Sequence, residues 1–336
     1  MRRLFLPLLL LLLLSSFAPS RAHKPFNNSQ TITARALPGI ASGERIGALT
    51  LVEAWELSSP HSQFGGLSGL ALTGDRAFLM INDAAYRLRF ALNADGTVRR
   101  ASFHRLPPPF AGYLGKFHYD AEALAHDPAT GRYWTAMEGT GQIWAFEGDD
   151  RRRTRVRQPV LDSWPENGGA EVLARLTDGR FIALSERAGL SGRHEGVMFS
   201  GDPARRTTTR FRFFHDPGEQ GAPTDAAALP DGRMILIHRK LGWSPVFTTS
   251  IAIADPRGLR PGDVLTSRPI AVIRDPRLAE NYEGAAVVSE ADGTLTLWLV
   301  SDDNQQDWQR TRLLRFRIDP AALRPAKRAA PSPARP

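Results

Sequence analysis

A short phrase recurs five times in the sequence between Leu67 and Val287. Each copy has a carboxylate or hydroxyl side chain, then small apolar residues, a turn, and an apolar run that ends in polar residues. The copies are Leu67-Ser68-Gly69-Leu70-Ala71, Ala121-Glu122-Ala123-Leu124-Ala125, Ala170-Glu171-Val172-Leu173-Ala174, Thr224-Asp225-Ala226-Ala227-Ala228 and Tyr282-Glu283-Gly284-Ala285-Ala286. Their key positions, 68, 122, 171, 225 and 283, are 54, 49, 54 and 58 residues apart. A period of about 50 residues is typical of a β-propeller or another radial or stacked array.

Each copy is followed by a hairpin signal, in which a Gly-Asp, Gly-Arg or Asp-Gly pair precedes an apolar run. Asp-Gly and its relatives supply the positive φ angles that tight hairpin turns require. No long stretch of the chain shows the apolar spacing of an amphipathic helix. We therefore expect an all-β fold in which each repeat opens with two antiparallel strands.

Two more strands are expected at opposite ends of the chain, over residues 48–52 and 313–318. If they pair in one blade, they close the ring and remove the exposed edges of the sheet. The five repeats and this terminal pair predict a β-propeller of six blades, with five or seven as the alternatives. We expect the propeller domain over residues 44–319, a lead-in linker over 23–43, and a disordered Pro/Ala/Arg tail over 320–336 that cannot bury a core.

The first 22 residues are typical of an export signal. Arg2 and Arg3 precede an apolar run from Leu4 to Leu14, and Ser20 and Ala22 supply small residues beside a cleavage point. The run is shorter than the roughly 18 to 20 apolar residues that span a bilayer, so no stable membrane anchor is expected after cleavage. We favour the general secretory route over the twin-arginine route. The chain has no cysteine, so it must rest on its core without disulfides, which suits a bacterial periplasm or the exterior.

The net charge of +8 does not indicate a nucleic-acid partner once it is located. Seven basic residues lie in the expected signal and tail, namely Arg2, Arg3, Arg21, Arg324, Lys327, Arg328 and Arg335. Without them, 36 basic residues face 35 acidic ones. The dense basic run over residues 151–157 is typical of a charged edge strand. We expect a monomer that acts on a small anionic or ester substrate and binds no nucleic acid.

The repeat places equivalent side chains around one axis. In a propeller the first strand of each blade lines the central channel, and the end of the second strand lies beside the start of the first. The first strands therefore bring Ser68, Glu122, Glu171, Asp225 and Glu283 to one rim of the channel. The second strands add Glu138, Glu186, Arg187, His238, Arg239, Asp302 and Asp303. A cup rich in carboxylates with a few cations is the expected result.

Converging carboxylates raise one another's pKa unless a cation compensates them. Three outcomes are open: a bound hard cation, a salt-bridge network with Arg187 and Arg239, or an acid/base pair. Oxygen ligands alone favour Ca²⁺ among metals. The predicted metal ligands are Glu122, Glu171, Asp225, Glu283, Asp302 and Asp303. The alternative is that these acids accept hydrogen bonds from backbone amides and only hold neighbouring blades together.

The same rim supplies the predicted catalytic and ligand-binding residues. Bound Ca²⁺ would polarise a substrate oxygen and activate water, while His238, Arg187 and Arg239 would stabilise an anionic transition state. The predicted catalytic residues are Glu122, Glu171, His238, Arg187 and Arg239. The predicted ligand-binding residues are His118, Asp120, Glu138 and Glu186. A purely structural histidine is the other interpretation of His118, which lies in an aromatic loop before Glu122.

Three segments of the chain resemble the phytase-like domain family, described as "esterase-like activity of phytase". They are Asp120-Ala121-Glu122-Ala123-Leu124-Ala125, Asn281-Tyr282-Glu283-Gly284-Ala285-Ala286 and Leu299-Val300-Ser301-Asp302-Asp303-Asn304. The resemblance spans roughly Phe64 to Ile318. It implies a secreted propeller-type fold and hydrolysis of phosphate or carboxylate esters, but it contributes no site residue. Two alternatives remain: a non-catalytic propeller that binds a ligand or protein on its rim, and a calcium-dependent lactonase.

Overall fold

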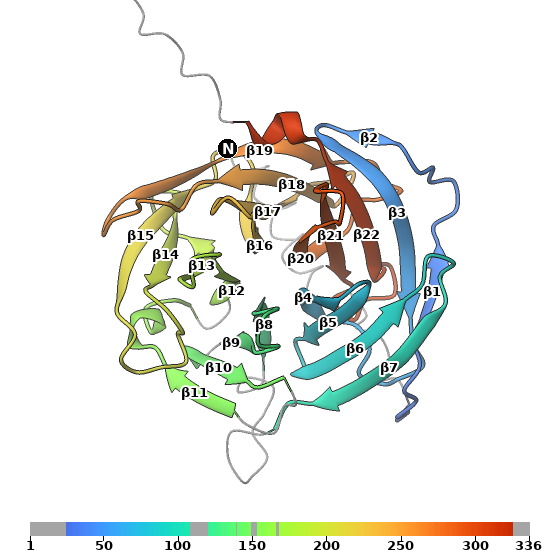
Figure 1. Cartoon of the computed structure of the whole chain (residues 1–336), viewed down its shortest axis with the longest axis horizontal. Coiled ribbons are helices and arrows are strands. Elements are labelled where there is room, and N and C mark those ends of the chain that lie inside the picture. The colour runs from blue at the N-terminus through green and yellow to red at the C-terminus, as the bar shows by residue number, and fades with distance from the viewer. Residues whose placement is uncertain (1–24, 108–119, 139, 149–152, 166–167, 325–336) are drawn as a thin grey trace, which may run out of the picture.

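The structure is a computed structural model, and it describes residues 25–107, 120–138, 140–148, 153–165 and 168–324. These residues form β-strands and two short 3₁₀ helices, η2 (Pro159–Leu161) and η3 (Pro320–Leu323). The strands radiate from a central axis as a β-propeller (Figure 1). Within the described residues, no helix has the length and apolar character needed to cross a membrane.

Each blade is a set of antiparallel strands with its first strand innermost (Figure 1), and the outermost strands of the third and fourth blades also pair in parallel, so these two blades share one sheet. The first blade contains β4 (Leu67–Gly74), β5 (Ala77–Asn82), β6 (Tyr86–Leu92) and β7 (Val98–Arg105). The second contains β8 (Ala121–His126), β9 (Tyr133–Met137), β10 (Gln142–Phe146) and β11 (Arg153–Arg157). The third contains β12 (Ala170–Arg175), β13 (Phe181–Ala188), β14 (His194–Phe199) and β15 (Arg210–Asp216). The fourth contains β16 (Ala222–Ala228), β17 (Met234–Leu241), β18 (Phe247–Ala254) and β19 (Val264–Ile273).

The fifth blade joins the two ends of the chain. It contains β20 (Asn281–Ser289), β21 (Leu295–Asp302), β22 (Arg312–Ile318) and β3 (Leu49–Ser58), with β1 (Thr33–Ala36) and β2 (Arg45–Ile46) paired to β3. In the antiparallel pairing of β3 with β22, Leu51 lies opposite Phe316. The terminal strands therefore pair with each other, as the sequence suggests, but they complete the last repeat and do not form a blade of their own. The expected count of six blades is wrong for the described part of the chain, which contains five.

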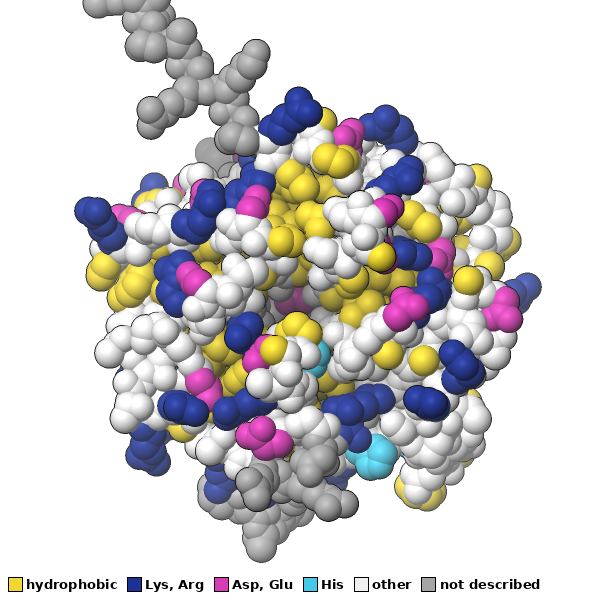
Figure 2. All heavy atoms as spheres, viewed as in Figure 1, with side chains coloured by type: hydrophobic (Ala, Val, Ile, Leu, Met, Phe, Trp, Pro, Cys, Tyr) yellow, Lys and Arg dark blue, Asp and Glu magenta, His cyan; other side chains and the backbone are white. Residues whose placement is uncertain are grey.

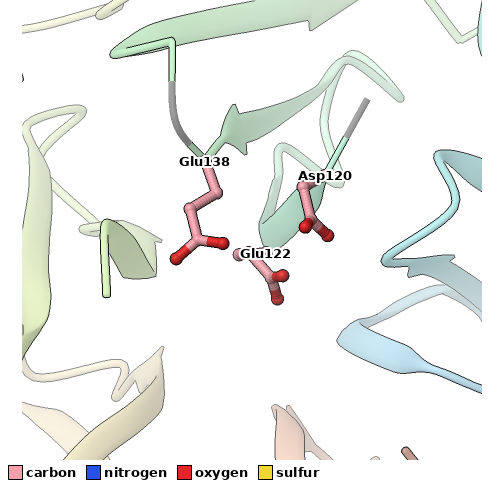
Figure 3. Close-up of side chains that lie close together, drawn as sticks. All are labelled: Asp120, Glu122 and Glu138. Carbon is pink, nitrogen blue, oxygen red and sulfur yellow. The ribbon is translucent and has the colours of Figure 1, made fainter. Parts of the chain in front are cut away.

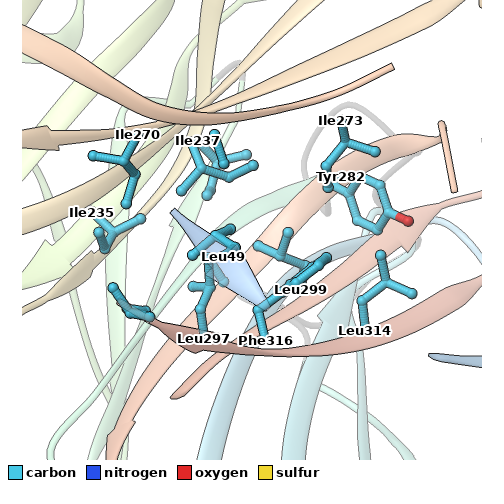
Figure 4. Packing of buried hydrophobic residues seen from close by; sticks show 14 of the residues in the cluster. Leu49, Ile235, Ile237, Ile270, Ile273, Tyr282, Leu297, Leu299, Leu314 and Phe316 are labelled. Atoms are coloured by element: carbon cyan, nitrogen blue, oxygen red, sulfur yellow. The ribbon is translucent and has the colours of Figure 1, made fainter. Parts of the chain in front are cut away.

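The apolar runs of the second strands are continuous because both faces of each blade are covered. On β17, Ile235 and Ile237 pack toward the fifth blade, together with Leu297 and Phe316 (Figure 4). The alternate residues Met234 and Leu236 belong to a cluster shared with the third blade. Side chains on a strand point alternately to the two faces, so one run serves two inter-blade cores. Burial of each such side chain stabilises the fold by roughly 1.5 to 3 kcal/mol.

Two expected boundaries change. The lead-in over 23–43 is not only a linker, because β1 extends the fifth blade by pairing with β3. The expected tail begins with ordered residues: the Asp319 carboxylate accepts a hydrogen bond from the Ala321 amide at 2.9 Å and caps η3. Ala322 and Leu323 pack against the apolar core. The expected signal over 1–22 and the tail beyond residue 324 lie outside the described residues.

The basic run over residues 151–157 contributes the edge strand of the second blade. β11 is the outermost strand of its sheet and pairs with β10. Within it, Val156 is buried, whereas the flanking Arg155 and Arg157 are partly or fully exposed. Charged side chains on an edge strand discourage pairing with another chain.

Candidate functional site

A β-bulge marks the key position in each repeat. The register between the first two strands shifts across Ser68, Glu122, Glu171, Thr224 and Glu283. A bulge places an extra residue in one strand and re-aims its side chain, and such features are common next to active sites. The repeated phrase therefore has a structural cause: each inner strand enters the channel with a bulged residue at its rim.

In the fourth repeat, the bulged residue lies one position before Asp225, the residue that the sequence alignment placed there. The bulged residue there is Thr224, whose hydroxyl donates to the Tyr282 carbonyl at 2.8 Å. The Asp225 carboxylate instead accepts hydrogen bonds from the amides of Ala226 at 2.7 Å and Ala285 at 2.6 Å. The hydrogen bond from Ala285 joins β16 to β20, whereas the one from Ala226 lies within β16. Asp225 was predicted as a metal ligand, and its geometry corresponds to the inter-blade packing alternative.

Glu122, Glu171 and Glu283, from three separate blades, form one acidic cluster at the rim. Burial raises the pKa of Glu122 well above its ordinary value, and the carboxylates of Glu171 and Asp120 raise it further. Burial likewise raises the pKa of Glu171, with a further contribution from Glu283. The structure therefore brings together the three glutamates that the repeat placed on one rim.

Arg239 is the cation that ties this cluster together. From β17 it donates to Glu283 on β20, to Glu186 on β13, and to the Asn281 amide oxygen at 2.6 Å. Burial alone would lower the pKa of Arg239, but Glu283 and Glu186 raise it above its ordinary value. One guanidinium therefore bridges three blades. The network that was one of the predicted outcomes is present, with Arg239 but not with Arg187.

Asp120, Glu122 and Glu138 make the tightest carboxylate group. One oxygen from each lies within 4.8 Å of the others, and Figure 3 shows the three side chains converging beside the start of β8. Glu138 is held by the backbone, because its Oε1 accepts hydrogen bonds from the amides of Gly168 and, at 3.2 Å, Gly169. Burial raises the pKa of Glu138 in spite of these bonds. Three converging oxygen ligands fit a hard divalent cation such as Ca²⁺.

The two aspartates at the end of β21 have different partners. Asp302 belongs to the acidic cluster: burial raises its pKa well above the ordinary value, and Glu283 and Asp83 raise it further. Asp303 follows the end of β21 and is buried, and its carboxylate accepts hydrogen bonds from the Gly66 amide at 3.1 Å and the Thr311 hydroxyl at 3.3 Å. Asp303 therefore holds the fifth blade to the first, and its predicted place among the metal ligands does not follow.

His238 is also turned away from the rim. It is fully buried between the third and fourth blades, with its Nε2 atom 2.9 Å from the Nε2 atom of His215. Because Arg239 follows it on β17 and points into the cluster, His238 must face the opposite side of the blade. It therefore cannot contact a substrate bound at the rim, and its predicted catalytic role is wrong.

Two other predicted residues have no place in the network. Arg187 is exposed, with its side chain against Gly168, and it makes no ion pair with another residue of the described chain. His118 lies outside the described residues. Sequence reasoning missed Asn281, whose amide donates to the Glu283 carboxylate at 2.8 Å. Its position directly before the fifth copy of the phrase was the available signal.

Fold and site together define a β-propeller protein with a buried, carboxylate-rich rim bridged by one arginine. A family model, "Phytase-like: Esterase-like activity of phytase", matches residues 62–305. The chain belongs to this phytase-like family, so the resemblance noted from the sequence is confirmed. None of the curated proteins matches the chain.

Several solved structures are similar to this chain. One is a chain of a nidogen/laminin complex, with 11% identity and a TM-score of 0.43, covering 86% of this chain and 98% of that one. Another is the PQQ-bound aldose sugar dehydrogenase of Streptomyces coelicolor, with 13% identity and a TM-score of 0.44, covering 87% and 100%. A third is hydrazine synthase of Kuenenia stuttgartiensis, with 13% identity and a TM-score of 0.37, covering 77% and 64%.

Proposed function

We propose that this protein is an exported hydrolase of phosphoesters or carboxylate esters whose rim carboxylates bind Ca²⁺. The observation that carries the proposal is the convergence of Asp120, Glu122 and Glu138 within 4.8 Å, beside Glu171 and further acids. So many buried carboxylates near one paired arginine call for additional positive charge. Export rests on the signal-like residues 1–22 and implies a periplasmic or extracellular location. A monomeric state is a separate part of the proposal.

The residues of the site can be given separate roles. Asp120, Glu122 and Glu138 would hold the ion, which supplies polarisation of the substrate oxygen and acidification of water when bound. Glu171 would accept a proton from the attacking water, because burial and the nearby Glu283 carboxylate raise its pKa above the ordinary value and so make it a stronger base. Arg187, exposed on this rim, would contact the anionic part of the substrate.

Arg239 takes a positioning role in this scheme. Its guanidinium already binds Glu186, Glu283 and Asn281, so it fixes the orientation of these carboxylates and has little capacity left for a substrate. Positioning of buried carboxylates by such a network is the usual way in which a site keeps its geometry.

A substrate screen tests the proposal directly. We expect the exported protein to hydrolyse nitrophenyl phosphate or nitrophenyl acetate, and to lose that activity in excess chelator. Hydrolysis of a lactone in preference to both would favour the lactonase alternative. No turnover of any of the three with calcium present would favour a non-catalytic propeller, the alternative that the packing roles of Asp225 and Asp303 support.

Replacing Glu122, Glu138 or Glu171 with glutamine should depress the same activity, each by at least about a hundredfold, since single catalytic groups contribute about 10² to 10⁴ in rate. Glutamine keeps the shape of the side chain but removes the charge. The matched control is Glu219→Gln, because the Glu219 side chain is 99% exposed. Initial rates at saturating substrate measure the effect. A loss at one glutamate only, with wild-type rates at the other two, would contradict a shared site.

Calcium binding should release protons and weaken as the pH falls. Burial raises the pKa values of Glu122 and Glu138, so these carboxyl groups keep their protons to a higher pH than exposed glutamates do, and they must lose any bound proton to bind the ion. Titration calorimetry at pH 7 in two buffers of different ionisation enthalpy measures the released protons. At a hundredfold excess over the dissociation constant, Ca²⁺ should stabilise the fold by roughly 2.7 kcal/mol. An unchanged melting temperature between millimolar calcium and excess chelator would remove the metal from the proposal.

A further inference from the structure

Three consecutive blades project large apolar side chains from corresponding loops. These loops connect the second and third strands: β13 to β14, β17 to β18, and β21 to β22. The first carries the fully exposed Leu190, and the third carries Trp308, which is 53% exposed. The second is a hairpin that carries Leu241 at 70%, Trp243 at 83% and Val246 at 42% exposure. We call these five residues the apolar tips.

The apolar tips lie at the same end of the propeller as the carboxylate site. Glu186, Arg239 and Asp302 each stand a few residues before one of these loops, and the three blades are neighbours around the ring (Figure 1). The rings of Phe247 and Trp308 stack at 6.0 Å between centroids, which joins the tips of the fourth and fifth blades. The opposite end of the channel differs, because hydrophobic side chains surround a central hollow on the face shown in Figure 2.

The corresponding loops of the first two blades do not share this character. Between β5 and β6 the chain turns tightly and buries Ala85. Between β9 and β10 the described residues are Glu138, Thr140 and Gly141. Within the described chain, the large exposed apolar residues of these connections therefore gather on one side of the ring.

A basic residue lies in or directly beside each loop. Arg193, Lys240 and Arg310 have side chains that are 43%, 53% and 45% exposed. Arg193, Lys240 and Arg310 lie 3.5, 3.2 and 3.8 Å from the carboxylates of Asp216, Glu219 and Glu56. Such exposed ion pairs are weak, so these basic side chains can exchange their partners for lipid headgroups. Basic side chains beside protruding apolar ones match the two layers of an anionic bilayer surface, with charged headgroups above an apolar interior.

We propose that the apolar tips dock this end of the propeller on an anionic lipid bilayer. Side chains exposed to this degree protrude, so they cannot form the concave walls that enclose a small molecule. A stable protein partner needs a contiguous, well-packed interface of about 800 Å² on each side, whereas these tips stand on separate loops. A fluid lipid surface closes around each protruding side chain, and tryptophan favours the membrane–water interface. Docking would turn the carboxylate site toward the headgroups; it does not depend on the proposed hydrolysis.

Vesicle co-sedimentation tests the docking. We expect the wild-type protein to bind vesicles of phosphatidylcholine with 30% phosphatidylglycerol more tightly than vesicles of phosphatidylcholine alone. The double variant Leu241→Ser/Trp243→Ser should bind the anionic vesicles at least tenfold more weakly. Val264→Ser is the matched control, because Val264 is 38% exposed and begins β19 at the opposite end of the fourth blade. All variants carry the same N-terminus, so the apolar run in residues 4–14 contributes equally to each.

Lys240→Glu separates the charge from the apolar tip. We expect it to reduce binding to anionic vesicles while leaving binding to neutral ones unchanged. Equal vesicle binding by the wild type and the double variant would overturn the proposal, as would no binding of the wild type to either vesicle. If the wild type forms a dimer in sedimentation velocity and the double variant does not, with no vesicle binding, the tips contact a second copy and the proposal is wrong.

Discussion

Replacing Arg239 with methionine is expected to lower the free energy of unfolding by about 3 to 5 kcal/mol. The change removes one partner of a largely buried ion-pair network and leaves Glu186 and Glu283 without the charge that compensates them. Because Arg239 links the third, fourth and fifth blades, the loss should appear as a lower midpoint of cooperative denaturation. Urea unfolding followed by tryptophan fluorescence measures it.

Two further variants make this prediction specific. Arg187→Met removes a guanidinium from the same rim but touches no ion pair of the described chain, so it should change stability by no more than about 0.5 kcal/mol. Adding Glu283→Gln to Arg239→Met should restore part of the loss, since the second change removes one of the uncompensated charges. If Arg239→Met and Arg187→Met have equal effects, the network does not stabilise the fold.

His238 should make the protein sensitive to mild acid. Burial lowers the pKa of His238 to about 3 and that of its neighbour His215 to about 4. The His215 Nδ1 atom donates to the Leu265 carbonyl at 3.0 Å, which leaves its Nε2 atom to accept from the Nε2 atom of His238. The neutral pair is therefore an integral contact between the third and fourth blades.

The direction of the effect follows from proton linkage. Below pH 6.5 these histidines bind protons in the unfolded chain, but in the folded protein the buried imidazoles do not. The stability that they contribute is therefore fully present above pH 6.5 and is lost as the pH decreases toward 3 or 4. Between pH 6.5 and pH 5, each of these histidines should lower the free energy of unfolding by roughly 2 kcal/mol. The rim acids act oppositely, because their raised pKa values make the folded state the stronger proton binder.

A comparison of variants isolates the histidine contribution. In His238→Leu, the free energy of unfolding should fall about 2 kcal/mol less between pH 6.5 and 5 than in the wild type. Denaturant titrations at both pH values measure this, with His104→Gln as the comparison, because His104 is an exposed histidine on β7. A pH dependence in His238→Leu identical to that of the wild type would contradict the prediction.

The all-β propeller followed from local patterns, but the number of blades did not. The phrase around Glu122, Glu171 and Glu283 repeats because each inner strand needs the same bulge, short apolar segment and turn. Five copies correspond to the five blades of the described chain. The error arose from treating the terminal strands as an additional blade, since strand pairing across 262 residues, as between Glu53 and Arg315, leaves no local signal.

The rim could be located from the sequence, but the roles of its residues could not. Alignment of the repeats correctly brought Glu122, Glu171 and Glu283 to one place. It assigned Asp225 where Thr224 holds the bulge, because a shift of one residue is invisible in a phrase of small apolar residues. It also placed His238 and Arg239 together on the rim, although successive residues on a strand face opposite sides.

The sequence alone therefore determined the periodic part of this protein: the strand pattern, the apolar runs that cover both faces of a blade, and the acids carried by the repeated phrase. These depend on short-range stereochemistry and side-chain alternation. Only the tertiary structure decided which acids meet a cation, which bind backbone amides, and which loops protrude together. Those outcomes depend on distances between blades, and the contacts of Arg239 with Glu186, Asn281 and Glu283 join residues 42 to 53 positions apart.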